Sequence, residues 1–203
     1  MTTFSRILTA AFLMSTTACA VEKEQDTGAM AGTVTDLDFA PDSVFGVFDT
    51  HETASGEAGI WQVFAEEDGT PEGNVRVQII MLEENGGPTE PGTYELGDLP
   101  SNGFLLGLAT GCREVDLGEE PCEQQFMSIP TGSVTFTALG LSKGESLTGT
   151  LNDITFVELD VDRMSERTPE ELENMDQDDW ILDREDGGQE FILDTWSFDV
   201  VLG

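Results

Sequence analysis

Histidine is almost missing from this chain, since His51 is the only one. A Ser-His-Asp or Cys-His catalytic site would have to use it, and zinc enzymes usually need several histidines or a mixture with cysteine. His51 stands in FDTHETASGEAG, a polar segment after an expected strand, where a solvent-exposed loop histidine is the ordinary interpretation. The sequence therefore favours neither histidine-dependent hydrolysis nor a zinc centre.

Most of the familiar catalytic motifs are missing as well. The sequence contains no H-E-x-x-H, no S-x-x-K and no P-loop, and it has no C-x-x-C pair. One G-x-S-x-G occurs, at residues 140–144, but His51 is the only histidine that could serve as its base. Paired carboxylates could still hydrolyse a glycoside, but with 41 acidic residues some pair falls at any spacing. We therefore expect no enzymatic activity.

Positive charge is scarce: 8 Lys and Arg face 41 Asp and Glu, which gives a formal net charge of -33. Nucleic-acid binding needs basic side chains to neutralise phosphates, so we expect no nucleic-acid partner. The acids spread along the whole chain, which favours a surface adapted to salty or ion-rich water. The alternative is a divalent-cation site, because Ca²⁺ prefers carboxylate and carbonyl oxygens.

Long apolar runs are confined to the N-terminus. Arg6 and the amino group supply positive charge, Ile7 to Met14 is apolar, and no acid precedes Glu22. This pattern is typical of an export signal, and it is too short to span a bilayer. We assign residues 1–18 to the signal peptide.

Two processing sites overlap at its end. Ala18-Cys19-Ala20 fits ordinary signal peptidase, which would cut before Val21. Thr16-Thr17-Ala18-Cys19 resembles the lipobox of bacterial lipoproteins, although that family prefers Leu where Thr16 stands. This resemblance implies that Cys19 is lipidated and becomes the first mature residue.

The compartment follows from the same resemblance. The residue after Cys19 is Ala20 and not Asp. In this respect the chain is similar to lipoproteins that are sorted to the outer membrane. Residues 19–31 are polar and small, and we interpret them as a tether whose residues 21–31 reach roughly 35 Å when extended. We expect an exported protein of the cell envelope, anchored to a membrane by lipid, or alternatively a free periplasmic or secreted form.

Only Cys112 and Cys122 remain besides Cys19. An exported protein meets an oxidising compartment, where paired cysteines are expected to form a disulfide. We predict that the Cys112–Cys122 disulfide staples a loop between two strands. A redox pair is the less favoured alternative.

From Gly32 onward the pattern is β, and we expect a single domain over residues 32–203. One face of the expected strand 75–82 is apolar and consists of Val75, Val77, Ile79 and Met81. The residues between them form a second face that is partly apolar. The expected strands are joined by Gly- and Pro-rich turns, which favours an antiparallel β-sandwich, with a β-barrel as the alternative. The expected strands are residues 33–39, 44–48, 60–64, 75–82, 103–109, 132–139, 147–161 and 190–202.

One short helix is expected in a long acidic excursion, residues 162–189. Thr168, Pro169 and Glu171 form a capping box with proline at the first helical position. Acids crowd in the second half of the excursion, without the spacing of an EF-hand. These candidate Ca²⁺ ligands are Asp176, Asp178, Asp179, Asp183, Glu185 and Asp186. A solvated acidic loop is the more ordinary interpretation, and a real site predicts that calcium raises the melting temperature.

Three segments carry a second resemblance: PGTYEL (91–96), GSVTFTAL (132–139) and LTGTLNDITFVEL (147–159). They are similar to strands of uncharacterised bacterial secreted and lipoprotein β-sandwiches. The resemblance implies a fold and a compartment, and it transfers no catalytic residues.

The sequence thus favours a cell-envelope lipoprotein that acts as a non-enzymatic surface-interaction or structural module, and one form of this hypothesis makes the module cation-dependent. The alternatives are a carbohydrate-binding module, which would show coplanar exposed aromatics, and a carboxylate-based hydrolase, which would need two buried acids. No resident cofactor is expected, and the sequence does not identify the protein or glycan partner.

Overall fold

The computed structural model describes residues 32–53, 56–70, 73–99, 103–112, 122–160, 168 and 184–203. The signal peptide, the tether and most of the acidic excursion, including its expected helix, lie outside these residues. In the described part the only helical segments are two short 3-10 turns, η1 (Glu83–Asn85) and η2 (Leu96–Asp98).

The described chain is mostly strand. The strands are β1 (Val34–Asp36), β2 (Ser43–Thr53), β3 (Gly56–Thr70), β4 (Gly73–Leu82), β5 (Gly92–Glu95), β6 (Phe104–Cys112), β7 (Gln124–Ser128), β8 (Ser133–Leu139), β9 (Ser146–Glu158) and β10 (Glu190–Val201).

All ten strands belong to one hydrogen-bonded sheet. Its main path runs β1-β10-β9-β7-β6-β4-β3-β2, while β8 pairs with β9 and β5 pairs with β8. Neighbours are antiparallel except β1, which runs parallel to β10. The all-β prediction is confirmed. The sheet is mixed and curled into a half-barrel, however, so the two sheets of an antiparallel sandwich are not confirmed.

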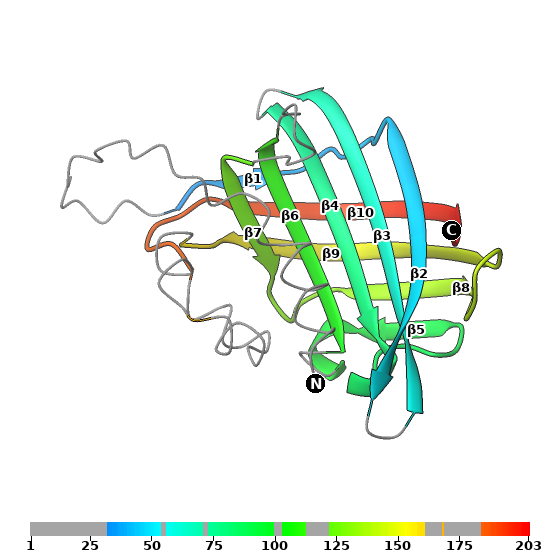
Figure 1. The fold of residues 1–203 in the computed structure, drawn as a ribbon. Coiled ribbons are helices and arrows are strands. Elements are labelled where there is room, and N and C mark those ends of the chain that lie inside the picture. Colours follow the sequence, from blue (N-terminus) through cyan, green and yellow to red (C-terminus); the bar gives the residue numbers. More distant parts are fainter. Residues whose placement is uncertain are drawn as a thin grey trace.

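The curl brings two halves of the sheet face to face. In Figure 1, β2, β3, β4, β6 and β7 lie in front, and β5, β8, β9 and β10 cross behind them at a steep angle. The core fills the space between, because alternate residues of both halves point inward. Its largest fully buried side chains include Trp61, Phe126, Phe136, Phe156 and Phe191.

The chain end helps to close the curl. Gly203 donates from its backbone N to the carbonyl O of Gly46 at 3.1 Å, beside a parallel bridge between Gly46 and Leu202. A Cβ at Gly46 would lie 2.7 Å from Cγ2 of Val200, so only glycine permits this approach. Strand β2 therefore meets the chain immediately after β10.

Gly149 lies opposite a local irregularity on β8. The register of β8 with β9 shifts between Phe136 and Ala138, which pair with Gly149 and Thr148, so β8 carries a bulge at this point. At Gly149 the ring of Phe198 takes the space of a side chain, since a Cβ would lie 2.7 Å from its Cζ.

Gly149→Ala is expected to lower the free energy of unfolding by about 1–3 kcal/mol, because the added methyl overpacks the core. Gly92→Ala is the matched control, since its Cβ would meet nothing closer than 3.6 Å. Denaturant unfolding of both variants measures the difference. Equal losses at the two positions would contradict the packing explanation.

Candidate functional site

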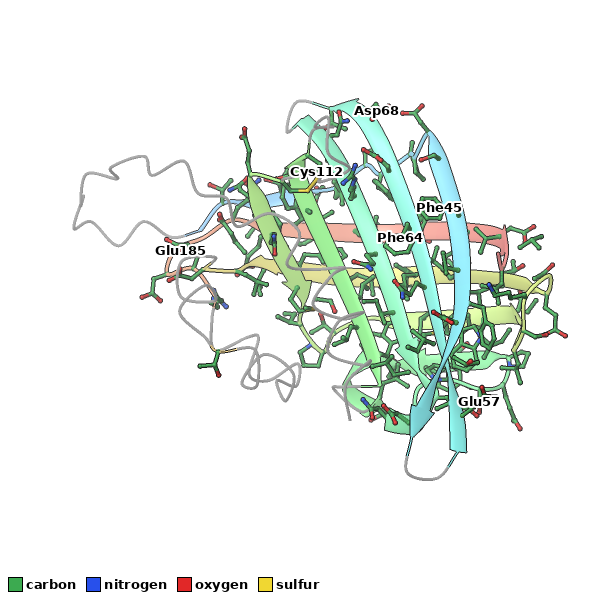
Figure 2. The ribbon with its side chains drawn as sticks, viewed as in Figure 1. Phe45, Glu57, Phe64, Asp68, Cys112 and Glu185 are labelled. Atoms are coloured by element: carbon green, nitrogen blue, oxygen red, sulfur yellow. A yellow bond between two sulfur atoms is a disulfide. The ribbon has the colours of Figure 1, made fainter. Side chains whose placement is uncertain are left out.

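The expected disulfide is present. Cys112 ends β6 and Cys122 lies two residues before β7, with 3.9 Å between their Cα atoms. The backbone N of Glu123 donates to the carbonyl O of Thr110 at 3.0 Å. The disulfide therefore lies at the end of the β6–β7 pair where β6 ends and β7 begins. It staples a connection between adjacent strands, as predicted (Figure 2).

The acidic candidates for a cation site divide between described and undescribed residues. Asp176, Asp178, Asp179 and Asp183 lie outside the described residues. Glu185 is half-buried and Asp186 is exposed, in a turn where the backbone N of Gly188 donates to the carbonyl O of Glu185 at 3.0 Å. Over the described ranges, no three His, Cys, Asp or Glu side chains gather closely enough to hold a metal.

The turn after Glu185 has a structural role. Gly187 has a φ of 72°, which favours glycine, and the next residues lead directly into β10. Glu158 of β9 braces this entry through both carboxylate oxygens. One accepts the side-chain amide of Gln124 and the other the backbone N of Gln189, both at 2.8 Å.

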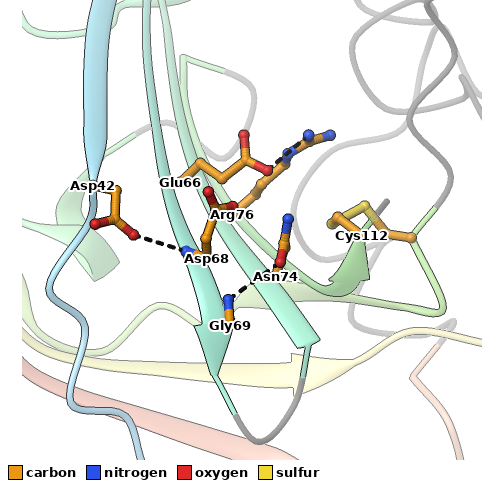
Figure 3. Close-up of polar contacts among 8 residues, drawn as sticks. Asp42, Glu66, Asp68, Gly69, Asn74, Arg76 and Cys112 are labelled. Atoms are coloured by element: carbon orange, nitrogen blue, oxygen red, sulfur yellow. Dashed lines mark hydrogen bonds and ion pairs between the residues drawn. A yellow bond between two sulfur atoms is a disulfide. The ribbon is translucent and has the colours of Figure 1, made fainter. Parts of the chain in front are cut away.

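Other carboxylates also serve the backbone at the tip of the β3–β4 hairpin (Figure 3). Asp42 accepts the backbone N–H of Asp68 at 3.1 Å, and Glu67 accepts that of Ala40 at 2.9 Å. Glu66 forms an ion pair with Arg76 at 3.0 Å. These acids hold the hairpin against the chain that enters β2, which gives part of the acidity a structural explanation.

None of the acidic residues whose burial the structure describes is buried. The buried polar side chains in the described part of the chain are Gln62, Thr110 and Ser128. The carboxylate hydrolase considered above requires two buried acids in a cleft, and the described residues supply no such pair.

His51 lies in strand β2, not in a loop. The strand continues to Thr53, and His51 pairs with Ala58 of β3. The sequence did not predict this extension, because the polar residues FDTHET show no apolar alternation. The extension depends on pairing with β3, which is a tertiary effect.

The aromatic side chains are mainly core residues. The buried aromatic residues of the strands include Trp61, Phe104, Trp196 and Phe198. Phe45 is 54% exposed, and its ring stacks on that of Phe64, with 5.0 Å between centroids and 19° between planes. The rings cover each other's faces, which is unlike the side-by-side platform expected of a carbohydrate-binding module.

A row of hydroxyl groups crosses the outward face of the rear strands. Thr93, Thr135, Thr150 and Ser197 are register neighbours on β5, β8, β9 and β10, and we name them the hydroxyl row. The Oγ1 atoms of Thr93 and Thr135 lie 3.0 Å apart, and Thr150 Oγ1 lies 2.9 Å from Ser197 Oγ. In a chain of net charge -33, these four adjacent positions carry no charge and can hydrogen-bond a partner.

Sequence reasoning missed the hydroxyl row. The alternation of Thr and Ser within each strand is visible in the sequence, but the register that aligns the four strands is not.

Comparison with known proteins identifies no relative. The chain matches no protein-family model, and no curated protein or solved structure matches it significantly. In the described part of the chain, no helix has the length and apolar character to cross a bilayer.

Proposed function

We propose that this protein is a lipid-anchored component of the cell envelope, whose β domain acts as a non-enzymatic surface-interaction or structural module. The observation that carries the proposal is the N-terminal arrangement. A lipobox-like Thr16-Thr17-Ala18-Cys19 is followed by a polar segment, residues 19–31, that leads into edge strand β1.

The position of β1 supports an anchoring role for the chain before it. β1 pairs with β10 alone among the described strands, and it begins at Val34, soon after the tether. Because the tether enters the domain at an edge strand, the surfaces far from that strand stay accessible to a partner. The acidic surface would hold the domain away from anionic headgroups.

The hydroxyl row supports the interaction part of the proposal. A row of neutral donors and acceptors can approach an uncharged surface without the desolvation cost of a carboxylate. In the form of the proposal that includes cation dependence, calcium raises the melting temperature. The absence of a shift over a wide calcium range removes that form and leaves the anchor untouched.

Cys19→Ser is expected to move the protein from the membrane fraction to the soluble fraction, because the lipid attachment point is lost. Thr16→Leu is the matched control, since it brings the motif closer to the lipoprotein pattern and leaves Cys19 in place. Fractionation followed by immunoblotting measures both. Membrane retention of the Cys19→Ser protein would contradict the proposal.

A further inference from the structure

Exposed apolar side chains gather where the curl of the sheet closes. In the described part of the chain, four large apolar side chains are exposed: Val34 at 57%, Phe45 at 54%, Leu141 at 48% and Val201 at 64%. Three of the four lie around the junction between β2 and the chain end that follows β10. We name these three the closure patch: Phe45, Leu141 and Val201.

The backbone at this junction places Phe45 and Val201 at neighbouring positions. Gly46 and Leu202 form a parallel bridge, and Phe45 and Val201 each come one residue before the bridged pair. Leu202 belongs to the core, and successive residues of a strand point to opposite faces, so Phe45 and Val201 both face outward. In Figure 1 the C-terminus accordingly lies beside β2.

The turn that carries Leu141 is tied to the same chain end. The backbone N of Leu141 donates to Oε2 of Glu145 at 2.7 Å, and the carbonyl O of Glu145 accepts the backbone N of Leu202 at 3.0 Å. Gly144 adds another link, because its backbone N donates to the carbonyl O of Leu202 at 2.7 Å. Hydrogen bonds therefore hold together the three segments that form the patch: β2, the β8–β9 turn and the chain end.

Phe45 provides the largest side chain of the patch. One face of its ring stacks on Phe64 of β3, and 54% of the residue is exposed, so the face that does not stack is open to solvent (Figure 2). An open aromatic face attracts a cation through its quadrupole, and it also packs against an apolar side chain. The patch therefore suits a partner that offers both.

Acidic side chains stand on two sides of the closure patch. Asp49 lies four residues after the patch residue of β2, Asp199 lies two residues before that of β10, and both acids are exposed. Even spacing along a strand places each acid on the outward face with the patch. Lys143 and Glu145 in the β8–β9 turn contribute one charge of each sign. In a chain of net charge -33, these surroundings attract a basic partner and repel an acidic one.

We propose that the closure patch binds a basic segment of a partner protein, which packs an apolar side chain on Phe45 and directs arginine or lysine toward Asp49 and Asp199. The inference rests on the proposed function, because it names the partner chemistry of the interaction module proposed there. Charge complementarity selects this occupant over two others. A second copy would bring the same acids face to face, and an anionic membrane surface would be repelled by them.

Binding of short dye-labelled peptides, measured by fluorescence anisotropy, tests the inference. The protein used is Cys19→Ser, which carries no lipid and needs no detergent. The probe alternates arginine and leucine, and two control peptides alternate arginine with serine and glutamate with leucine. The probe is expected to bind more tightly than either control, because it alone supplies both positive charge and apolar contact. Equal binding of either control peptide would overturn the inference.

Phe45→Ala is expected to weaken binding of the arginine–leucine peptide roughly fivefold or more, and to change binding of the arginine–serine peptide less. Val34→Ala is the matched control, because Val34 is similarly exposed but lies on β1, at the other end of the main strand path. Asp199→Asn keeps an acceptor for Oγ1 of Thr148 and removes the charge, so it is expected to weaken binding more at low salt than at high salt. Equal effects of Phe45→Ala and Val34→Ala would contradict the inference.

A second patch variant covers a failure of Phe45→Ala to fold. Leu141→Ala changes a side chain in a turn and is expected to weaken binding of the same peptide. A dimer that Phe45→Ala dissociates in sedimentation would assign the patch to a second copy, and binding to phosphatidylcholine vesicles that Phe45→Ala abolishes would assign it to lipid; either result would overturn the inference. Membrane fractionation of Cys19→Ser reports the anchor separately, so failure of the patch and failure of the anchor proposal are distinguishable.

Discussion

Trp61→Ala is expected to lower the free energy of unfolding by about 3–5 kcal/mol, the largest stability effect of a single substitution considered for this protein. Trp61 is 1% exposed at the centre of β3, and its ring packs on Phe48 of β2 with 5.6 Å between centroids. Its Nε1 donates to the carbonyl O of Gly140 at 2.8 Å, across a wide separation in the chain. Alanine leaves a cavity and also deprives that buried carbonyl of its donor.

Trp61→Phe separates the two contributions. It keeps most of the apolar volume but removes the donor, so a loss of about 1–3 kcal/mol is expected. Urea unfolding followed by circular dichroism measures both variants, and Trp61→Phe still yields a value if Trp61→Ala does not fold. A loss below about 1 kcal/mol for Trp61→Ala would contradict the placement of this ring in the core.

Loss of the Cys112–Cys122 disulfide is expected to cost about 2–3 kcal/mol by the loop-entropy argument, for a sequence separation of 10. The bond restricts the unfolded chain, while the hydrogen bonds of the β6–β7 pair hold the same region in the folded state. The double variant Cys112→Ala and Cys122→Ala should therefore keep the fold with a lower denaturation midpoint.

Reduction provides the matched control for that variant. Dithiothreitol should lower the midpoint of the unmodified protein and leave the alanine variant unchanged, because only the former has a bond to break. An equal effect of the reductant on both proteins would show that the loss does not come from this disulfide.

The sequence predicted the strands best where apolar alternation is strong. The alternation of Val75, Val77, Ile79 and Met81 identified β4, which pairs antiparallel with β3. β7 (Gln124–Ser128) was missed, because five residues with two glutamines give little alternation. Its place between β6 and β9 comes from tertiary pairing.

The overall curl was less accessible to sequence reasoning. Alternation gives each strand an inward face, and the same pattern suits a sandwich, a barrel or a half-barrel. What decides between them here is pairing at long range, such as β7 with β9 and Gly46 with Leu202. No local signal in either segment specifies its partner.

The candidate sites differ in how far the sequence alone predicts them, for a related reason. The disulfide could be predicted because, on the hypothesis that the chain is exported and Cys19 is lipidated or removed, the two remaining cysteines have one pairing to make. The partly apolar second face of β4, which carries Ile80 and Leu82, could be read from the sequence, but the pairing of Ile80 with Leu105 on β6 needs the register of the sheet. The hydroxyl row needs that register entirely.

The intact mass of the mature protein isolated from membranes tests the central claim most directly. The account predicts a chain that begins at Cys19 and carries a diacyl or triacyl increment. A free chain that begins at Val21, without any lipid increment, would contradict it.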